Sequence, residues 1–370
     1  MRRFVLCLIL MAMACMAANC EDVGPVPPPI PDPVDCYWVA PDGTTNGDGS
    51  RQRPWPDVPC ALERVGGGHC ITVRPGVYRG PWSIRKSGTQ QRPTIVRAEQ
   101  KWQAVVVGSE THTIWITGDW CVLDGFRVEG ARFDGVKSDG DYVNIRNCWV
   151  RHNGSQGITA HDVTLNVIER NLVEFNGSNI QFDHGLYVDG RKLVVRSNVV
   201  RHNTGYGIQF YDSLQDSLVA HNVIYGQASM RGMVVYGSGN AVVHNTVYEY
   251  DTAIKSRGSG HLVANNILVG SCDLQGATKK ANYTGRDPGF VDPRKGVLWL
   301  SGNSPARGAA DLQYSSTSDF WNRPQASPDQ GAFAYEAFFE TAAARAGWNE
   351  GYPYPREKSG VVMPDLWAPP

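Results

Sequence analysis

The chain has 370 residues, of which 19% are charged and 42% are hydrophobic, and its formal net charge is −1. This near neutrality argues against a strongly basic nucleic-acid-binding protein and against an acidic disordered tail, and the apolar content is sufficient for a large core. With 40 Gly and 23 Pro, and with Val, Ile, Asn and Gly dominating its middle, the chain is predicted to be β-rich and turn-rich.

The N-terminus has the pattern of an export signal. Two arginines follow Met1, and residues 4–14 (FVLCLILMAMA) form an apolar run that is too short for a stable membrane span. We therefore expect residues 1–19 to be a signal peptide and the mature protein to be periplasmic, extracellular or on the outer surface. Because Cys15 and Cys20 follow the apolar run, a lipoprotein signal is the alternative, and its lipid would be the only membrane anchor. The Pro-rich residues 20–35 are predicted to be a linker.

The remaining cysteines fit disulfide bonding in an exported chain. CYWVAP (36–41) and CITVRPG (70–76) are predicted to be neighbouring strands in register, which places Cys36 beside Cys70. No CxxC or HxxxH spacing is present, so metal binding by these cysteines is disfavoured. The other four are Cys60, Cys121, Cys148 and Cys272.

From residue 121 the chain repeats every 21 to 27 residues. Each repeat has β-forming residues before and after a recurring polar position, then a second short strand such as GITAHD or GLYVDG, and no helix. Such a unit cannot close its own core and must stack on its neighbours. A solenoid of parallel strands results, in which stacked Asn amides bond along the axis and hold a turn. The recurring positions are Gly125, Asn147, Asn171, Asn198, Asn222, Asn245 and Asn266.

Three regions resemble secreted right-handed parallel β-helix proteins of the pectate-lyase-like superfamily. Residues 37–98 resemble their opening coils, the Asn repeats resemble their body, and residues 287–336 (DPGFVDPRKG to DQGAFAYE) resemble their closing segment. The resemblance implies an all-β, right-handed parallel β-helix over residues 36–336. Within it, 36–112 are N-terminal coils with a capping helix near 57–66, 113–271 are regular coils, and 272–336 are closing coils. Residues 337–370 are predicted to be a C-terminal helix and tail, and the protein is expected to be a monomer.

Each of six consecutive repeats contains one of these second short strands. Alternation of residues along them separates core positions from surface positions. The inward positions are Val136, Ile158, Leu186, Ile208, Met233 and Ile254, followed by Ser138, Ala160, Val188, Phe210, Val235 and Ser256. The outward positions form two columns: Lys137, Thr159, Tyr187, Gln209, Val234 and Lys255, then Asp139, His161, Asp189, Tyr211, Tyr236 and Arg257. A third column precedes the strands: Asp134, Gln156, His184, Tyr206, Arg231 and Thr252.

This outward face carries the candidate chemistry. Abstraction of the carbon-5 proton of a uronate needs a base, a proton donor and a cation that neutralises the carboxylate. We predict His161, Tyr187, His184, Asp189, Lys137 and Arg231 as catalytic residues, with His161 oriented by Asp139 or Asp189. Tyrosines stack on sugars and cations bind uronate carboxylates, so the predicted substrate-binding residues are Gln209, Tyr211, Tyr236, Lys255 and Arg257. His152, His202, His221 and His244 fall in turns or beside the recurring Asn and are interpreted as scaffold.

The motif GITAHD (157–162) is similar to the Gly-x-Asp-Pro-His-Asp/Glu motif of alginate carbon-5 epimerases at Gly157, His161 and Asp162, and departs from it at Thr159 and Ala160. Calcium-dependent lyases of this fold use clustered Asp ligands, for which Asp139, Asp162 and Asp183 are the candidates, although no adjacent Asp pair is present. The motifs of pectin hydrolases are missing, which argues against inverting glycoside hydrolysis by paired acids.

The predicted function is a polysaccharide lyase or carbon-5 epimerase acting on an acidic polysaccharide such as alginate or pectin. It requires no cofactor, with Ca²⁺ as the alternative, and no nucleic-acid partner. The rival hypothesis is a non-catalytic carbohydrate-binding, structural or adhesive β-helix of the cell envelope, because this fold serves many functions.

Overall fold

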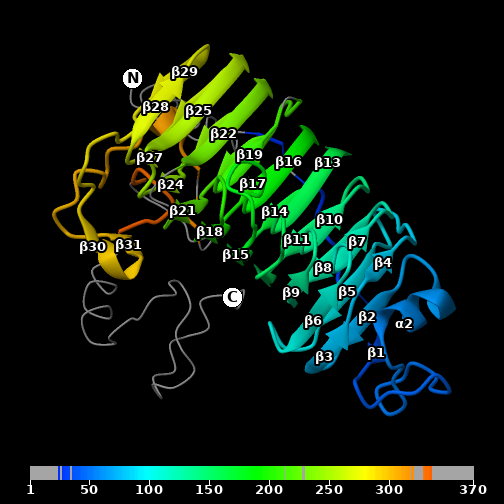
Figure 1. Cartoon of the computed structure of the whole chain (residues 1–370). Coiled ribbons are helices and arrows are strands. Elements are labelled where there is room, and N and C mark those ends of the chain that lie inside the picture. Colours follow the sequence, from blue (N-terminus) through cyan, green and yellow to red (C-terminus); the bar gives the residue numbers. More distant parts are fainter. Residues whose placement is uncertain are drawn as a thin grey trace, which may run out of the picture.

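The computed structural model describes residues 24–25, 27–33, 36–211, 213–226, 230–316, 318–320 and 328–335. Within them the chain winds into a parallel β-solenoid with three long sheets, whose strands stack coil upon coil (Figure 1). The predicted all-β solenoid is confirmed. The predicted signal peptide at 1–19 and the predicted C-terminal helix and tail at 337–370 lie outside the described residues.

Sheet A has eleven strands and each of the other two has nine. In sheet A these are β1 (Cys36–Val39), β2 (Cys70–Val73), β5 (Thr94–Ala98), β8 (Cys121–Asp124), β11 (Asn144–Arg146), β14 (Val167–Glu169), β17 (Val194–Arg196), β20 (Leu218–Ala220), β23 (Ala241–Val243), β26 (His261–Ala264) and β29 (Ala277–Lys280). In sheet B they are β3 (Gly76–Arg79), β6 (Ala104–Ser109), β9 (Arg127–Ala131), β12 (Trp149–Arg151), β15 (Leu172–Glu174), β18 (Val199–Arg201), β21 (Val223–Tyr225), β24 (Thr246–Val247) and β27 (Ile267–Leu268). In sheet C they are β4 (Trp82–Ile84), β7 (Ile114–Ile116), β10 (Val136–Ser138), β13 (Ile158–Thr164), β16 (Leu186–Arg191), β19 (Ile208–Phe210), β22 (Arg231–Ser238), β25 (Thr252–Ser259) and β28 (Ser271–Leu274).

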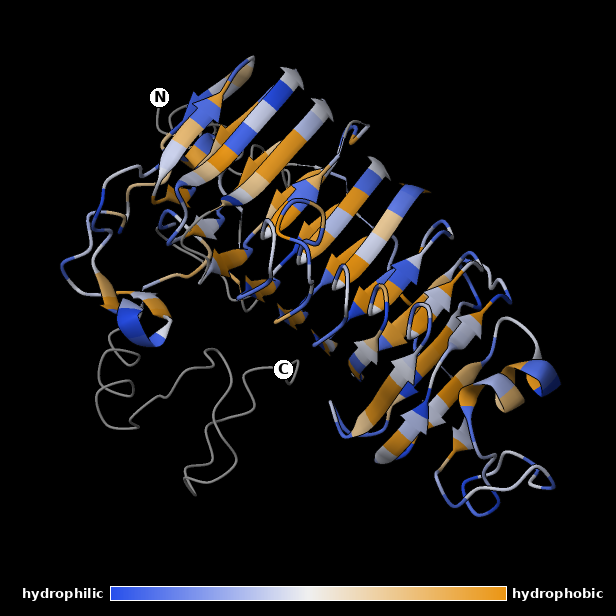
Figure 2. Ribbon diagram, in the orientation of Figure 1, coloured by the Kyte–Doolittle hydropathy of each residue, from blue (hydrophilic) through white to orange (hydrophobic). Residues whose placement is uncertain are grey.

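The core fills the space between the three sheets. Figure 2 shows apolar residues recurring along the stacked strands. The predicted inward positions of sheet C are confirmed, since all twelve are completely buried. Alternation therefore predicted the interior correctly. On the outward side, Thr159 and Val234 are buried as well.

The Asn ladder is present but shifted by one residue at its start. The amide Nδ2 of Asn171, Asn198, Asn222, Asn245 and Asn266 donates to the Oδ1 of the next Asn along the solenoid, and the ladder ends at Asn282. The prediction placed Asn147 and Gly125 in this ladder, which is wrong. Cys148 holds the slot, while Asn147 and Gly125 occupy the preceding turn position, where φ is positive. Asn tolerates that left-handed conformation better than most residues do.

The N-terminal cap matches the prediction. Helix α2 (Val58–Val65) begins at Asp57, whose side chain accepts the N–H of Cys60, and packs Val58, Ala61 and Leu62 against the first coil. Strands β1 and β2 pair in register, and a disulfide joins Cys36 to Cys70 as predicted. Cys60, Cys121, Cys148 and Cys272 are not in disulfides.

The closing segment covers the outer face of sheet B. Strands β30 (Phe290–Asp292) and β31 (Val297–Leu300) form an antiparallel pair around the 3-10 turn η1 (Pro293–Lys295), and a second turn, η2 (Leu312–Tyr314), follows. Trp299, Phe320 and Phe333 form a second core with outward residues of sheet B such as Val199 and Val223. None of the helices among the described residues has the length and apolarity needed to span a membrane.

Candidate functional site

The outer face of sheet C carries one row of side chains in strict register. It begins two coils earlier than predicted, with Ser83 of β4 and Trp115 of β7. The row continues through Lys137, Thr159, Tyr187, Gln209, Val234 and Lys255. Trp115 escaped sequence reasoning because the repeat was recognised only from residue 121, although IWIT (114–117) occupies the same phase as VKSD (136–139).

The clearest chemical feature of this face is a histidine held by a buried carboxylate. The Nδ1 of His161 lies 2.6 Å from Oδ2 of Asp189, and the other Asp189 oxygen accepts the backbone N–H of Asp162 at 2.5 Å. The side chain of His161 is 60% exposed whereas that of Asp189 is 2% exposed. Because a carboxylate accepts the Nδ1 proton, Nε2 is the ring nitrogen that faces solvent and can exchange a proton.

A β-bulge produces this pair. The register between β13 and β16 shifts between Ala160 and Val163, so that His161 and Asp162 together stand opposite Asp189. Asp189 was predicted to lie on the outward face, and at the bulge its carboxylate is buried and bonded to His161 and to the backbone N–H of Asp162. Gly190 has φ of +135°, and a Cβ there would lie 1.9 Å from the Val163 carbonyl oxygen, so the bend requires glycine.

Asp139 was the other predicted partner of His161, and its carboxylate bonds elsewhere. Its carboxylate accepts the Trp115 Nε1–H at 2.6 Å and lies 3.5 Å from the Lys137 ammonium nitrogen. The ammonium also lies 5.4 Å from the centre of the Trp115 ring. Lys137 is therefore held between a carboxylate and an aromatic face, with 28% of its side chain exposed.

His184 belongs to a hydrogen-bonded ladder along the edge of sheet C. The Nδ1 of His184 accepts the backbone N–H of Tyr206. The backbone N–H of His184 donates to the side chain of Gln156, and the backbone N–H of Gln156 donates to the side chain of Asp134. Its ring is buried and stacks on Tyr206 at 4.6 Å. Burial lowers the pKa of His184 to about 4, so the imidazole is neutral at pH 7. These contacts give His184, which was predicted to be catalytic, a structural role.

Tyr187 and Arg231 are placed around this ladder. The Tyr187 ring lies 6.0 Å from that of His184 and 5.9 Å from that of Tyr211. Arg231 donates to the Tyr206 hydroxyl at 2.6 Å and so joins the group through Tyr206.

The predicted substrate-binding residues lie further along the same face. Tyr211 is 43% exposed, and the Lys255 ammonium lies 6.0 Å from the ring centre of Tyr236. Arg257 forms an ion pair with Asp273. The Gln209 side chain partly offsets the lowering of the pKa of His184 that burial causes.

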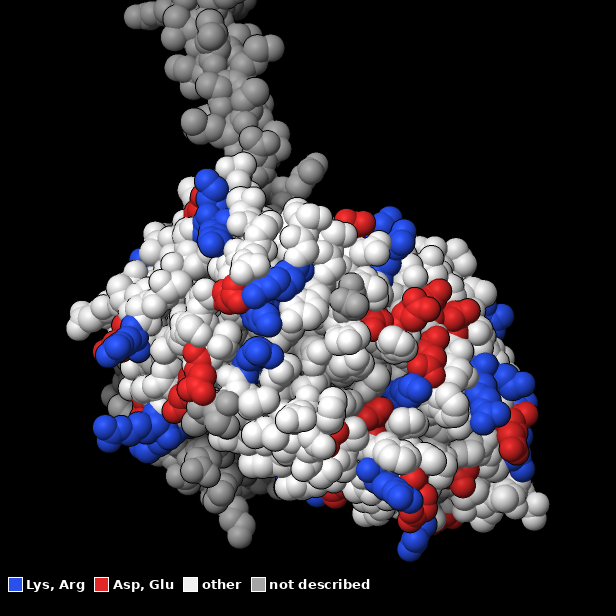
Figure 3. Space-filling model, turned by 45° about the horizontal axis from the view of Figure 1, so that its top comes forward, with Lys and Arg blue, Asp and Glu red and all other residues white. Residues whose placement is uncertain are grey.

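The three candidate calcium ligands are not gathered into one site. Asp183 accepts the backbone N–H groups of Ser178 and Asn179 and so closes its own loop. Asp139 is engaged as described, and Asp162 lies in the bulge. Among the described residues no group of three His, Cys, Asp or Glu side chains is arranged to hold a metal ion. Figure 3 shows charges of both signs in small groups on the side of the molecule in view.

A second histidine–carboxylate pair was not foreseen from the sequence. The Nδ1 of His112 lies 3.2 Å from Oδ2 of Asp134, at the start of the ladder that contains His184. Burial raises the pKa of Asp134, and the nearby His112 opposes this rise. The sequence did contain a signal for this pair. Asp134 was assigned to the third column, and His112 holds the same position one coil earlier.

Comparison with known proteins agrees with this architecture. A family model described as "Right handed beta helix region" matches residues 97–247. Pectate lyase L of Dickeya dadantii (strain 3937) is 27% identical over 138 residues, and pectate lyase L of Dickeya chrysanthemi is 25% identical over the same length. Each alignment covers 33% of this chain and 32% of the relative, so the match spans about a third of the length of either pectate lyase.

Among solved structures, that of pectate lyase Pel9A superposes with a TM-score of 0.65 and 19% identity, over 82% of this chain and 97% of that one. At this level of identity the superposition reports on the fold. Together with the family match, it leads to one conclusion. The chain is a right-handed parallel β-helix, and over about a third of its length it is similar in sequence to pectate lyases.

Proposed function

We propose that the protein is an exported polysaccharide-active enzyme that abstracts the carbon-5 proton of a uronate residue, as a β-elimination lyase or a carbon-5 epimerase. The observation that carries the proposal is the His161–Asp189 pair, an exposed imidazole oriented by a buried carboxylate. An exposed histidine has no structural need for such a partner. The same arrangement gives a general base a fixed tautomer and direction.

The neighbours of Thr159 supply the other groups that the reaction needs. Lys137 and Tyr187 flank Thr159 on the adjacent strands, and His161 follows it by two residues. Strand spacing puts the Cα of His161 roughly 8 Å from the Cα atoms of Lys137 and Tyr187, within reach of one bound sugar. We assign His161 as base, Lys137 as the cation on the uronate carboxylate, and Tyr187 as proton donor.

The chemistry then proceeds as follows. Nε2 of His161 takes the carbon-5 proton, and the electron pair left on carbon 5 delocalises into the carboxylate held by Lys137. In a lyase this pair forms the C4–C5 double bond, the C4–O bond breaks, and Tyr187 protonates the departing oxygen. In an epimerase Tyr187 instead returns a proton to carbon 5 from the opposite face. Neither route needs a cofactor.

Two further features support the setting. The relatives named pectate lyase L suggest that the substrate is an acidic polysaccharide. The Cys36–Cys70 disulfide fits an exported protein, since such bonds persist outside the reducing cytosol.

Purified protein should be incubated with polygalacturonate, alginate and glycosaminoglycans. Ultraviolet absorbance of the unsaturated product detects a lyase, and deuterium incorporation at carbon 5 without cleavage detects an epimerase. We expect His161→Gln to reduce kcat by at least about 100-fold, because general-base catalysis typically contributes 10²–10⁴-fold. Asp189→Asn should also reduce kcat, since an uncharged amide has one acceptor oxygen and cannot accept both the His161 Nδ1 proton and the Asp162 N–H. The matched control is His202→Gln, an exposed histidine on a distant turn, which should retain activity.

A carbohydrate-binding or structural role is the second candidate. It is favoured by the extent to which predicted site residues serve the fold, namely His184 in the ladder and Arg257 in an ion pair. In that case the protein binds acidic polysaccharide with no product and no exchange, and His161→Gln leaves binding intact. Such a result would refute the enzymatic assignment.

A further inference from the structure

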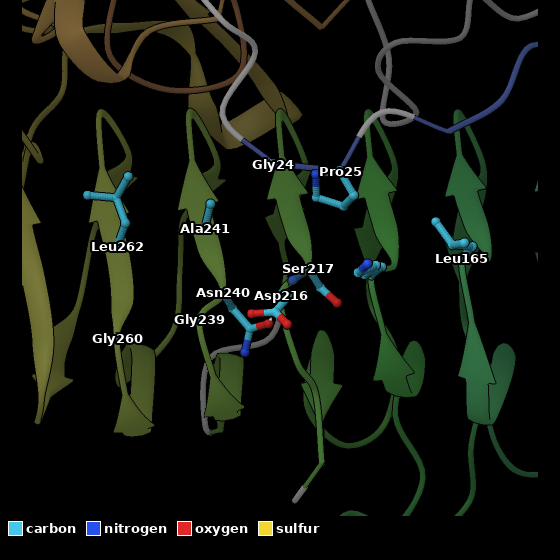
Figure 4. Close-up of a pocket in the computed structure, with 11 residues that line it drawn as sticks. Gly24, Pro25, Leu165, Asp216, Ser217, Gly239, Asn240, Ala241, Gly260 and Leu262 are labelled. Atoms are coloured by element: carbon cyan, nitrogen blue, oxygen red, sulfur yellow. Dashed lines mark hydrogen bonds between the residues drawn. The ribbon is translucent and has the colours of Figure 1, made fainter.

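The Pro-rich segment predicted to be a linker packs on the solenoid. Ile30 lies against outward side chains of sheet A, and Gly24 and Pro25 lie farther along the same sheet, beside Ala241 and Leu262 (Figure 4). The closing segment covers part of sheet B in a similar way. Within the described part of the chain, sheet C is therefore the outer face that neither segment covers, and it is the face on which a polysaccharide has room to bind.

Trp115 stands near the N-terminal end of the sheet C row and is fixed by three neighbours. Its Nε1–H donates to Asp139 at 2.6 Å, the Lys137 ammonium lies 5.4 Å from the ring centre, and the His112 ring lies 6.1 Å away at an angle of 60°. On the other side Ser83 is the neighbour in register, and its small side chain leaves room beside the half-buried indole. An indole held in this way is a flat apolar surface of set orientation, which suits stacking against the C–H face of a sugar.

Exposed aromatic side chains continue this surface along the edge where the strands of sheet C begin. Phe133 is 45% exposed, and its ring lies 6.1 Å from that of His112. Phe182 is 66% exposed, and its backbone carbonyl accepts the side-chain amide of Gln156 at 2.6 Å. Large apolar side chains grouped on a surface are typical of a place where a ligand binds.

The charges beside Trp115 disfavour a bound anion. The Lys137 ammonium lies 3.5 Å from the Asp139 carboxylate, and its charge also acts on the buried carboxylate of Asp134. Lys137 is thus shared between two carboxylates of the protein. A second uronate next to the one that Lys137 holds would meet this negative charge.

The far end of the row has the opposite charge. Arg257 donates a hydrogen bond to Asp273. This bond, together with the charges of Arg257, Lys255 and Arg231, holds the pKa of the Asp273 carboxyl below its usual range. Three cations therefore surround one carboxylate, about 29 Å from Trp115 at six coil steps. Uronates fit this end of the row, whereas an uncharged sugar fits the end with Trp115.

We propose that Trp115 binds an uncharged sugar, and that the substrate is a polysaccharide in which this sugar adjoins the uronate held by Lys137. The inference deepens the proposed function and rests on it for that uronate. Trp115 and Lys137 are one coil step apart, about 4.8 Å, which is close to the length of one pyranose ring along its chain. The C–H face of the sugar stacks on the indole, and its hydroxyl groups donate to the Asp139 carboxylate. A homopolymer of uronate places a carboxylate against Asp139 instead, which weakens its binding.

Binding of hexasaccharides, measured by calorimetry in the full chain with His161→Gln as background, tests the proposal. Two probes alternate a uronate with an uncharged sugar (from hyaluronan and from the rhamnogalacturonan backbone), and two contain uronate alone (from polygalacturonate and from alginate). We expect at least one mixed probe to bind at least tenfold more tightly than either homopolymer, and Trp115→Ala to remove most of this preference. The matched control is Trp38→Ala, which should bind as the background does. Trp38 is also half-buried and lies beneath the guanidinium groups of Arg51 and Arg74, far from sheet C.

A second variant, Asp139→Asn, separates the charge of the site from its shape. Asparagine keeps an acceptor for the Trp115 Nε1–H and removes the negative charge, so the homopolymers should gain affinity relative to the mixed probes. An unchanged ratio of the two affinities would overturn the role assigned to charge. Circular dichroism and thermal unfolding establish that each variant is folded.

Equal affinity for mixed and homopolymeric probes in the background, no binding of any probe, or an equal loss for both classes in Trp115→Ala would overturn the proposal. Failure of the proposed function has a different signature. If the wild-type protein binds the mixed probes through Trp115 but neither cleaves them nor exchanges the carbon-5 proton, the sugar site stands and the enzymatic assignment fails. Turnover of homopolymers that Trp115→Ala leaves unchanged would do the reverse.

Discussion

Acidification should weaken the attachment of the closing segment, because two stacked histidines are buried beneath it. The rings of His221 and His244 lie 5.2 Å apart and nearly parallel, and both side chains are buried. The Nδ1 of His244 lies 3.1 Å from the carbonyl oxygen of Asp329, to which it must donate. Nε2 therefore accepts, from Ser316 N–H at 3.4 Å and from the Asn265 amide at 3.3 Å. Protonation would turn Nε2 into a donor that faces two other donors, the Ser316 N–H and the Asn265 amide.

The direction of the pH effect follows from the pKa values. Burial lowers the pKa of His221 to about 4, and burial together with the neighbouring His221 lowers that of His244 to about 3. In the unfolded chain a histidine has a pKa of about 6.5. Below pH 6.5 the unfolded state therefore binds more protons than the folded state, so stability falls as the pH falls toward 4. Arg196 is the charged side chain that also disfavours protonation of His221.

The expected loss of folding stability is large for a small pH change. Each pH unit between 6.5 and the folded pKa costs about 1.4 kcal/mol per histidine, so pH 5 costs about 2 kcal/mol for each ring and about 4 kcal/mol for the pair. Urea unfolding at pH 7 and pH 5, followed by tryptophan fluorescence and circular dichroism, measures this difference. Trp299 of the closing segment is buried and should report on its release.

The variant that isolates the effect is His221→Asn with His244→Asn, since Asn accepts the positive φ of both positions. It should lose most of the stability difference between pH 7 and pH 5. The control is Phe320→Ala, which lowers stability in the same segment without changing a titrating group and should keep the difference. If the double Asn variant keeps the wild-type difference, the two histidines are not its source and the reasoning is refuted.

Three other substitutions test the fold directly. Asn222→Ala should lower the free energy of unfolding by about 3 kcal/mol in urea titrations, because it removes two donated and two accepted bonds of a fully buried amide; a loss below 1 kcal/mol would contradict the ladder as a stabilising element. Replacing Cys36 and Cys70 together by Ser should cost about 4 kcal/mol, the loop-closure value for a separation of 34 residues, and an unchanged melting temperature would argue against it. Gly190→Ala should disrupt the bulge and lower kcat, while most of the thermal stability is kept. A variant with normal activity would show that the bulge is dispensable.

The interior of the solenoid could be predicted because it depends on local alternation repeated at a recognisable period. Every sheet C position assigned to the core is buried, from Val136 to Ser256, and the Cys36–Cys70 pairing followed from the same register argument. Each of these predictions needs only that strands of successive coils lie in register. In a parallel solenoid, backbone hydrogen bonding between coils enforces that condition.

The errors arise where one residue type suits two adjacent positions. Asn147 has the residue type of the ladder, but the left-handed turn position before the ladder also favours Asn, and Cys148 fills the slot that follows. His184 presents the same difficulty in reverse. Its Nδ1 accepts the backbone N–H of Tyr206 in the next coil, whereas the Oδ1 of a ladder Asn accepts one from the preceding coil, so a residue chosen for its chemistry also bonds within the scaffold.

The candidate base stands where the regular repeat is interrupted. Ile158 and Leu186 are partners in register although the loop between them, closed by Asp183, is longer than its neighbours. The bulge at His161 and Asp162 follows directly after the residues in register. A perfect solenoid would point Asp189 into solvent beside His161, where water would weaken their interaction. The bulge buries the carboxylate and leaves the imidazole exposed. A one-residue shift of register leaves no mark on the spacing of a repeat that already varies in length, so the sequence could identify the two partners but not the geometry that makes them a pair.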